Sequence, residues 1–376
     1  MTTEKKNKVL FVIDTLEIGG AERSLLSNIA RFRHLQAVVC HIYNGDSLKQ
    51  KFVEKGITVY SLNIPGKYNF LNAYKKLVQI INSEQPDVMV AYLTRSEIVT
   101  RLAGRFHRIP VVGTFVNDLY CSDYNKHLSL KAKLGVQCFK YINKWMSKSC
   151  VGFVANSAAI KDANVQHLNI HPAKIKVINR GRESAHILQK KEELPTQEKR
   201  MRLLNVSRLR PVKAQKLLIA AFKTFSDKYP NATLHIAGDG PLLEELTAMI
   251  MHNGLQQKVA LLGERNDVPQ LLAEYDCFIF PSLVEGFSGA VVEAMFAKLP
   301  VLASDIPQNK EAVTHLQTGY LFEADSVKAI EEALFWFAEN RTKATFMAEQ
   351  AYQFARANFE LQHIAETFED YLQSTI

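Results

Sequence analysis

Short runs of β-branched and other apolar residues alternate with segments of helical period along the first half of the chain. Between these runs, Ala21–Phe32, Tyr74–Ile81 and Ile98–Phe106 repeat apolar residues at the spacing of one helical face. Such alternation predicts βα units on a parallel sheet. The strands predicted in this half are Val9–Ile13, Ala37–Ile42, Thr58–Leu62, Val88–Tyr92, Pro110–Thr114, Val151–Ala155 and Ile175–Ile178.

A second series of the same kind begins after the charged segment 186–200, which has no apolar period and is predicted to be a linker. We therefore predict an α/β protein with two Rossmann-like, doubly wound domains, at 1–185 and 201–357. After the last strand the chain is predicted to be helical, and its final helix, 358–376, could cross back to the first domain. The strands predicted in the second domain are Leu203–Val206, Thr233–Ala237, Val259–Leu262, Cys277–Phe280, Val301–Ala303 and Tyr320–Phe322.

Composition is that of an ordinary globular protein, with 47% hydrophobic and 22% charged residues. No apolar run approaches the ~20 residues of a membrane-spanning helix, and the first apolar run is too short for a signal peptide. The five cysteines are scattered and include no C-x-x-C pair, so neither a disulfide framework nor a zinc site is predicted. These features indicate a cytoplasmic protein.

Charge is distributed unevenly along the chain, whose net charge is +8. Residues 1–190 carry 28 basic and 13 acidic side chains, a net +15, whereas the remainder carries a net −7. We therefore expect an anionic partner for the first half, either a phosphorylated substrate or a membrane surface. No nucleic-acid partner is predicted, because the chain lacks an RNA-recognition signature, a zinc finger and a basic zipper.

Glycines and cations follow several predicted strands, at the edge where ligands bind in open α/β sheets. Gly19 and Gly20 precede a helix whose amino end offers N–H groups to a phosphate, although a tight turn would also explain them. Arg208 and Lys213 flank the corresponding loop of the second domain, and both suit a diphosphate. At Gly238, in the next strand-to-helix turn, turn formation alone is at least as good an explanation as ligand contact.

Two glutamates follow the predicted strand Cys277–Phe280. Glu285 lies in the loop after this strand, Gly289 stands near a helix start, and Glu293 lies one turn inside that helix. Both carboxylates are expected at the same edge of the sheet. Carboxylates accept paired hydrogen bonds from hydroxyls, so the two predict a polyol ligand such as a sugar or a ribose. Either glutamate alone could instead be a charge that the helix dipole favours.

The second domain resembles the retaining nucleotide-sugar glycosyltransferases of family four, which have the GT-B fold of two Rossmann-like domains facing across a cleft. The similarity runs from Val9 to about Phe322 and keeps the motifs in order. The matches are the E-x7-E motif at Glu285 and Glu293, the R-x4-K pair at Arg208 and Lys213, the glycine-rich turn at 238–241 and the amino-terminal loop at 19–23.

The resemblance implies retaining transfer of a sugar from a UDP- or GDP-linked donor to a glycan or lipid-linked acceptor, in surface polysaccharide or glycoconjugate synthesis. Arg208 and Lys213 would hold the diphosphate, Glu293 would bind the ribose, and Glu285 would contact the donor sugar at its reacting face. No cofactor or divalent metal is implied, and the chain contains no D-x-D sequence. The other donor-binding residues implied are Gly19, Gly20, Gly238, Ser288, Gly289 and, near the nucleobase, Arg265.

On the acceptor side the chain departs from the family, in which many members carry a His-Asp pair where this chain has Asn117 and Asp118. An amide can orient a hydroxyl but cannot accept its proton, so both residues are candidate acceptor-side catalytic groups. The turn Asn179–Arg182 also differs from the usual proline-asparagine-glycine turn. Two alternatives to a transferase stay open: a GT-B sugar-nucleotide epimerase, and a non-catalytic partner subunit that keeps the fold.

A lysine-rich segment suggests a membrane partner. At 100° per residue, Lys133, Lys140, Lys144 and Lys148 cluster on one face of a predicted helix. This face predicts peripheral contact with anionic headgroups at the inner side of the membrane, although an ordinary helix with solvated lysines would show the same pattern. The apolar residues of the opposite face, expected to lie toward the core, are Leu134, Cys138, Phe139, Ile142, Trp145 and Met146.

Overall fold

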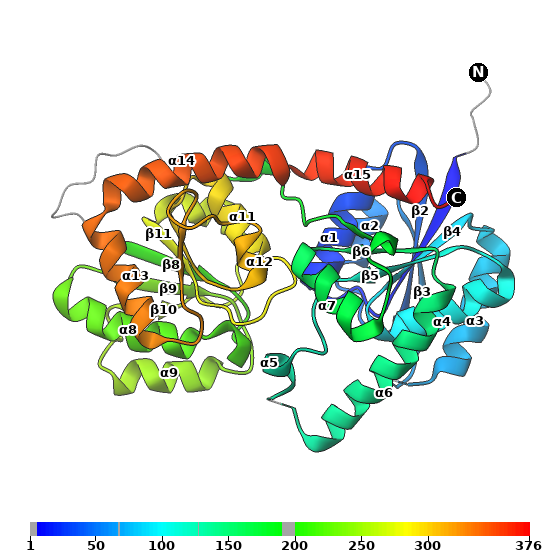
Figure 1. The fold of residues 1–376 in the computed structure, drawn as a ribbon, viewed down its shortest axis with the longest axis horizontal. Helices are drawn as coiled ribbons and strands as arrows, with labels where there is room; N and C mark the ends of the chain where they lie inside the picture. Colours follow the sequence, from blue (N-terminus) through cyan, green and yellow to red (C-terminus); the bar gives the residue numbers. More distant parts are fainter. Residues whose placement is uncertain (1–5, 67, 127, 190–199) are drawn as a thin grey trace. The chain divides into compact units, whose positions relative to one another are not determined.

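The computed structural model divides the chain into two compact units (Figure 1). The first unit comprises the chain up to Gly181 together with residues 361–376, and the second comprises residues 182–360. The change of unit precedes the segment 186–200 that we expected to be the linker, of which residues 190–199 lie outside the described part. The described residues are 6–66, 68–126, 128–189 and 200–376.

A sheet of seven parallel strands forms the centre of the first unit, in the order β3-β2-β1-β4-β5-β6-β7. Leu10 and Val12 of β1 face one core cluster, whereas Val9, Phe11 and Ile13 face the other. Because helices bury both faces, the strands read as nearly continuous apolar runs. The strands are β1 (Asn7–Ile13), β2 (Leu35–Tyr43), β3 (Thr58–Ile64), β4 (Val88–Tyr92), β5 (Val111–Phe115), β6 (Gly152–Ala155) and β7 (Ile175–Val177).

Helices connect these strands and place both sheet faces in the interior. The α1 side of the sheet contains Leu25 and Ile29, and the other side contains Leu77 of α3 and Val99 of α4. The helices are α1 (Gly20–Ile29), α2 (Lys49–Glu54), α3 (Phe70–Glu84), α4 (Thr94–His107), α5 (Ser122–Asn125), α6 (Leu130–Met146) and α7 (Ala158–Leu168).

The second unit is built in the same way on six parallel strands, in the order β10-β9-β8-β11-β12-β13. These two sheets confirm the predicted pair of doubly wound α/β units. The strands are β8 (Arg202–Val206), β9 (Thr233–Ala237), β10 (Val259–Leu261), β11 (Cys277–Phe280), β12 (Val301–Ser304) and β13 (Tyr320–Phe322). The helices are α8 (Gln215–Lys228), α9 (Leu243–His252), α10 (Val268–Leu271), α11 (Gly289–Phe296), α12 (Pro307–Lys310), α13 (Val327–Glu339) and α14 (Arg341–Asn358).

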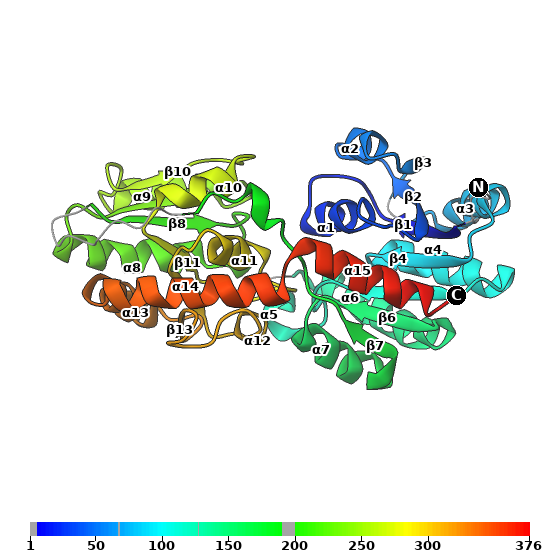
Figure 2. The ribbon, with the colours of Figure 1, turned by 90° about the horizontal axis from the view of Figure 1, so that it is seen from above.

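The last helix, α15 (Leu361–Gln373), belongs to the first unit although it follows the second in sequence (Figure 2). Its residues Ile364, Phe368 and Leu372 are buried in the same core cluster as β1. A helix that buries apolar side chains in this way contributes to the stability of the unit it covers. The first unit is therefore completed by the end of the chain.

A buried carboxylate also joins α15 to the start of β2. Glu369 is 2% exposed, and it accepts hydrogen bonds from the backbone N–H groups of Arg33, His34 and Leu35 at 2.7–3.0 Å. These N–H groups precede or open the strand, so the carboxylate satisfies donors that the sheet leaves unpaired. The contact fixes where β2 begins.

Helix α6 lies with its apolar face outward, contrary to the expected packing. Leu134 and Trp145 are 69% and 70% exposed, whereas Asn143 is buried. Asn143 accepts a hydrogen bond from Arg101 of α4 at 3.2 Å, and Lys140 approaches His167 of α7. The contact with the rest of the unit uses this polar side of the helix. Six apolar residues of α6 were expected to lie in the core, and most of them face solvent instead, with Met146 the one that is buried.

Candidate functional site

The loops after β8 and β11 bring a cation and a carboxylate together at one edge of the second sheet. Lys213 ends a short 3₁₀ turn, and its Nζ donates to Oε1 of Glu285. Their side chains are only 18% and 11% exposed, and Lys213 Nζ lies 5.8 Å from the centre of the Phe280 ring. The pair therefore combines opposite charges in a largely desolvated setting, where electrostatic interactions are stronger than in bulk water.

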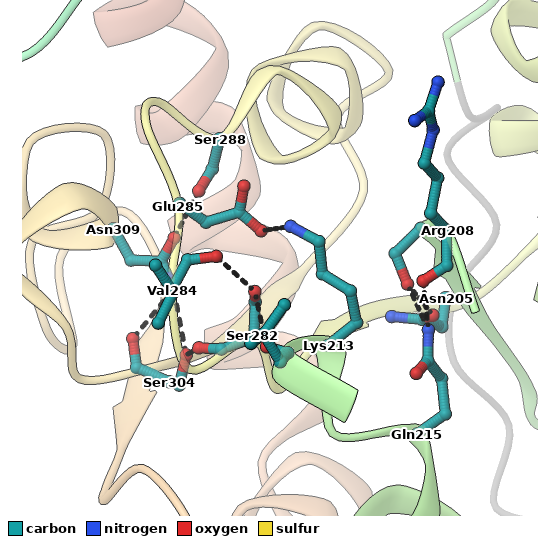
Figure 3. A network of polar contacts seen from close by, with 12 residues as sticks. Asn205, Arg208, Lys213, Gln215, Ser282, Val284, Glu285, Ser288, Ser304 and Asn309 are labelled. Carbon is teal, nitrogen blue, oxygen red and sulfur yellow. Dashed lines mark hydrogen bonds and ion pairs between the residues drawn. The ribbon is translucent and has the colours of Figure 1, made fainter. Parts of the chain in front are cut away.

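Buried polar side chains support the loop that carries Glu285 (Figure 3). Ser288 donates to Asn309 Oδ1 at 2.5 Å, Asn309 donates to the Ser304 carbonyl oxygen at 2.9 Å, and Ser304 donates to the Ser282 carbonyl oxygen. All four residues are at most 1% exposed. A satisfied buried network of this kind fixes a loop in one conformation. The hydroxyl of Ser288, a predicted donor-binding residue, thus supports the loop.

A second network holds the loop that carries Arg208. The amide of Gln215 donates to Ser207 Oγ and to the Arg208 carbonyl oxygen, both at 2.9 Å, and Ser207 donates to Asn205 Oδ1 at 2.8 Å. The backbone of this loop is thereby fixed, whereas the Arg208 side chain is exposed and extends away from Lys213 (Figure 3). The two predicted phosphate-binding cations lie on one loop but do not converge in this structure.

Gly238 is required by contact between two protein loops. Its φ is +145°, and a Cβ at this position would lie 2.0 Å from the Ser207 carbonyl oxygen. Its N–H donates to the Gly263 carbonyl oxygen at 2.7 Å. The backbone that approaches Gly238 is that of the Arg208 loop, and the missing side chain lets the two loops lie this close together.

Arg265, expected near the nucleobase, lies at the surface of the second unit. Its Nε donates to Asp267 Oδ1 at 2.8 Å, and this bond lowers the pKa of the Asp267 carboxyl. The two residues line a shallow hollow together with Glu264, Asn266 and Gln270. Such a hollow offers polar groups to a planar ring, and within it Arg265 and Asp267 are paired with each other.

Glu293 and Gly289 of α11 both contact Arg182, a residue that the sequence marked only as a departure from the usual turn. Arg182 Nε donates to Glu293 Oε1 at 2.5 Å, and the two side chains are 25% and 22% exposed. A Cβ at Gly289 would lie 1.8 Å from Arg182 Nη2, so the guanidinium lies directly against this glycine. The N–H of Gly289 donates to the Phe287 carbonyl oxygen at 3.0 Å.

The amino end of α1 in the first unit is surrounded by charged side chains. Gly19 precedes the helix in an extended conformation, and a Cβ there would lie 2.2 Å from Oε2 of Glu22. A Cβ at Gly20 would lie 2.9 Å from Nη1 of Arg180. The carboxylate of Glu22 thus already interacts favourably with the helix amino terminus, where a phosphate was expected.

The acceptor-side candidates follow β5. Asn117 is exposed, whereas Asp118 Oδ1 accepts from the Tyr120 N–H at 3.0 Å and lies 3.5 Å from Nε2 of His167. Lys140 Nζ lies 3.4 Å from the other ring nitrogen of His167. The fold therefore places a histidine beside Asp118, although the chain lacks the family histidine at position 117. No sequence motif indicated His167, which comes from α7.

Within the described part of the chain, no group of three or more His, Cys, Asp or Glu side chains is arranged to hold a metal ion. Among the same residues, no helix has the length and apolar character needed to cross a membrane.

Two family profiles match almost the whole chain. The profile described as "Glycosyltransferase Family 4" matches residues 18–185, and the one described as "Glycosyl transferases group 1" matches residues 187–354. The chain belongs to the family-four glycosyltransferases. Its fold also matches a solved structure, Anabaena Alr3699/HepE in complex with UDP and glucose, with a TM-score of 0.84, 24% identity and coverage of 98% of this chain and 100% of that one.

Three curated relatives of this glycosyltransferase are 26–29% identical to it. The UDP-Gal:alpha-D-GlcNAc-diphosphoundecaprenol alpha-1,3-galactosyltransferase of Escherichia coli is 26% identical, with 78% of this chain and 75% of the relative covered. A Campylobacter jejuni N-acetylgalactosaminyltransferase, whose acceptor is named as a diphospho-undecaprenol-linked sugar, is 29% identical over 87% and 89%. An uncharacterized Methanocaldococcus jannaschii glycosyltransferase is 28% identical over 63% of this chain, which spans 60% of that protein.

Proposed function

We propose that this glycosyltransferase moves a sugar, with retention, from a UDP- or GDP-linked donor to a lipid-linked or glycan acceptor in surface polysaccharide or glycoconjugate synthesis. The observation that carries this proposal is the pairing of Lys213 with Glu285 at the sheet edge, with Glu293 on the helix that follows. In this proposal the loop after β8 supplies a cation, and the loop after β11 with α11 supplies a sugar-binding and a ribose-binding carboxylate. Family membership supports the same reaction class.

In this proposal two cations stabilise the negative charge of the leaving group. Lys213 and Arg208 bind the diphosphate and stabilise the negative charge that grows on the leaving nucleotide. The charge that a divalent metal supplies in other transferases thus comes from side chains. Glu285, released from Lys213 when the phosphate binds, contacts the donor sugar, and Glu293 accepts hydrogen bonds from the ribose.

The acceptor is proposed to be lipid-linked, since two relatives are named for diphosphoundecaprenol-linked acceptors. Asp118, with His167 beside it, is the proposed group that orients the acceptor hydroxyl. Asn117 follows β5 on the same loop and could donate or accept a further hydrogen bond there. In this assignment Asp118 and His167 stand on the acceptor side in place of the His-Asp pair that many family members carry.

Peripheral membrane contact is proposed to use α6, with apolar side chains as well as lysines. Five exposed residues fall on one strip of the helix, and Lys131 and Lys144, also exposed, flank it. An apolar strip between lysines is the pattern of a helix that lies in a membrane interface. Of the lysines predicted to form the contact, Lys133 and Lys140 are half-buried, whereas Lys144 and Lys148 are exposed. The strip residues are Leu130, Leu134, Cys138, Tyr141 and Trp145.

The test is turnover of a panel of UDP- and GDP-sugars, with and without a diphosphoundecaprenol-linked sugar acceptor. A transferase releases nucleotide and extends the lipid-linked sugar, and the release increases with acceptor. Conversion of the sugar nucleotide without acceptor would instead identify an epimerase. Donor binding with no turnover under either condition would identify a non-catalytic subunit.

A further inference from the structure

Arg182 sits at the proposed donor site without belonging to any of the motifs that define it. Its guanidinium contacts Glu293 through Nε and lies against Gly289, the first residue of α11. Glu293 is the proposed ribose ligand, and the start of α11 is the proposed phosphate-binding end. One side chain therefore contacts both the proposed ribose ligand and the proposed phosphate-binding end of α11.

The backbone of Arg182 is anchored independently of its side chain. Its N–H donates to the Phe359 carbonyl oxygen at 2.9 Å, and it forms a β-bridge with Glu360. The Phe359 ring in turn packs on Phe287, with 5.2 Å between ring centres. A truncated side chain at position 182 should therefore leave the chain path and the Glu285 loop in place.

The Arg182–Glu293 pair is accessible to a ligand. With side chains 25% and 22% exposed, both groups lie at the surface of the site rather than in the core. A guanidinium has five N–H donors in a planar fork, so it can contact a carboxylate on one side and a phosphate on another. Gly289 leaves the space that this fork occupies, since any side chain there would collide with it.

We propose that Arg182 is a third donor-binding cation of this chain, one that neutralises Glu293 in the empty site and binds the diphosphate in the loaded one. This inference rests on the proposed function, because it assumes that Glu293 and α11 hold a nucleotide. When the ribose hydroxyls bind Glu293, the guanidinium exchanges its contact with this carboxylate for the phosphates beside Gly289.

The experiment compares the binding of UDP and GDP, by calorimetry, with that of uridine and guanosine, by ligand-observed NMR. For whichever base binds the wild-type protein, Arg182→Ala should weaken diphosphate binding about tenfold, because it removes a charge-assisted hydrogen bond. Nucleoside binding should change less than about twofold, and Arg182→Lys should restore part of the diphosphate affinity. Arg341→Ala is the matched control, since Arg341 pairs with Asp276 at 3.6 Å, just before β11 and so at the other end of that strand.

Three outcomes overturn the inference. Unchanged or tighter diphosphate binding by Arg182→Ala would make the arginine an obstacle rather than a ligand. Equal weakening of diphosphate and nucleoside would show that it acts only by positioning Glu293. Failure of the wild-type protein to bind either nucleoside diphosphate would remove the proposed function itself, a result that the wild-type titration alone reveals.

Discussion

At the scale of single residues, the contact between Lys213 and Glu285 makes Lys213 the most informative cation to change. Lys213→Ala should lower kcat/KM by about 30- to 1,000-fold, equivalent to about 2–4 kcal/mol of transition-state stabilisation, because the leaving diphosphate loses a cation. The matched control is Lys216→Ala, which removes a lysine paired with Glu245 at the surface. Steady-state kinetics with the best donor measures both, and an unchanged kcat/KM for Lys213→Ala would remove it from the site.

The two motif glutamates should be separable by kinetics. Glu293→Gln should mainly raise KM for the donor, because ribose contacts persist from the ground state to the transition state. Glu285→Gln should mainly lower kcat, because this carboxylate is proposed to contact the donor sugar beside the bond that breaks. Both substitutions keep side-chain size and remove charge. Initial rates over a range of donor concentrations decide the point, and equal effects on KM with kcat untouched would contradict the assigned roles.

Some neighbours in the site could be anticipated from sequence and others could not. Lys213 and Glu285 follow strands that end at the same sheet edge, so their proximity follows from the order of parallel strands. Arg182 reaches Glu293 across 111 positions, and His167 of α7 reaches Asp118 in the loop after β5. Such contacts depend on how side chains of distant segments pack, which hydrophobic period and motif spacing do not specify.

At the scale of elements, α15 offers a direct test of how the end of the chain stabilises the first unit. Glu369→Gln should lower the free energy of unfolding by about 2–4 kcal/mol, because a buried carboxylate that accepts three backbone hydrogen bonds becomes a weaker acceptor and a misplaced donor. Glu366→Gln is the control on the same helix, since Glu366 is 43% exposed and pairs with Arg33 at 3.4 Å. Its effect should stay within about 0.5 kcal/mol. Urea denaturation checks both variants, and similar losses would contradict the special role of Glu369.

Element positions were largely predictable because buried parallel strands leave a clear apolar signal. The predicted strands Val88–Tyr92, Cys277–Phe280 and Tyr320–Phe322 coincide with β4, β11 and β13. Helix α6 shows the limit of this signal. The periodicity of the sequence predicted that α6 is a helix but not which of its faces packs against the rest of the unit. Polar Asn143 and Lys140 supply the contacts with α4 and α7. A hydrophobic period identifies an apolar face, whereas tertiary packing decides whether core, solvent or another surface meets it.

At the scale of the whole molecule, the charge asymmetry and the exposed strip of α6 together predict which part of the chain meets a membrane. Residues 1–181 and 361–376, which form the first unit, carry 26 basic and 15 acidic side chains, a net +11, whereas residues 182–360 carry a net −3. We therefore expect an anionic surface to attract the first unit and to disfavour contact by the second. Electrostatic attraction alone would act at a distance and depend steeply on salt, at about 1 kcal/mol per basic residue near the surface. The apolar strip adds a contribution that salt does not screen.

Vesicle sedimentation of the full chain separates these two contributions. Binding should require phosphatidylglycerol and weaken, without vanishing, as salt rises. Replacing Leu134, Tyr141 and Trp145 by serine should abolish the salt-resistant part, whereas Lys131→Gln with Lys144→Gln should reduce mainly the salt-sensitive part. Met251→Ser is the control, because Met251 of α9 is 60% exposed on the second unit. Equal binding to neutral vesicles would contradict the electrostatic contribution. Absence of binding to anionic ones would mean that the strip meets some other surface and that this transferase reaches its acceptor without docking through α6.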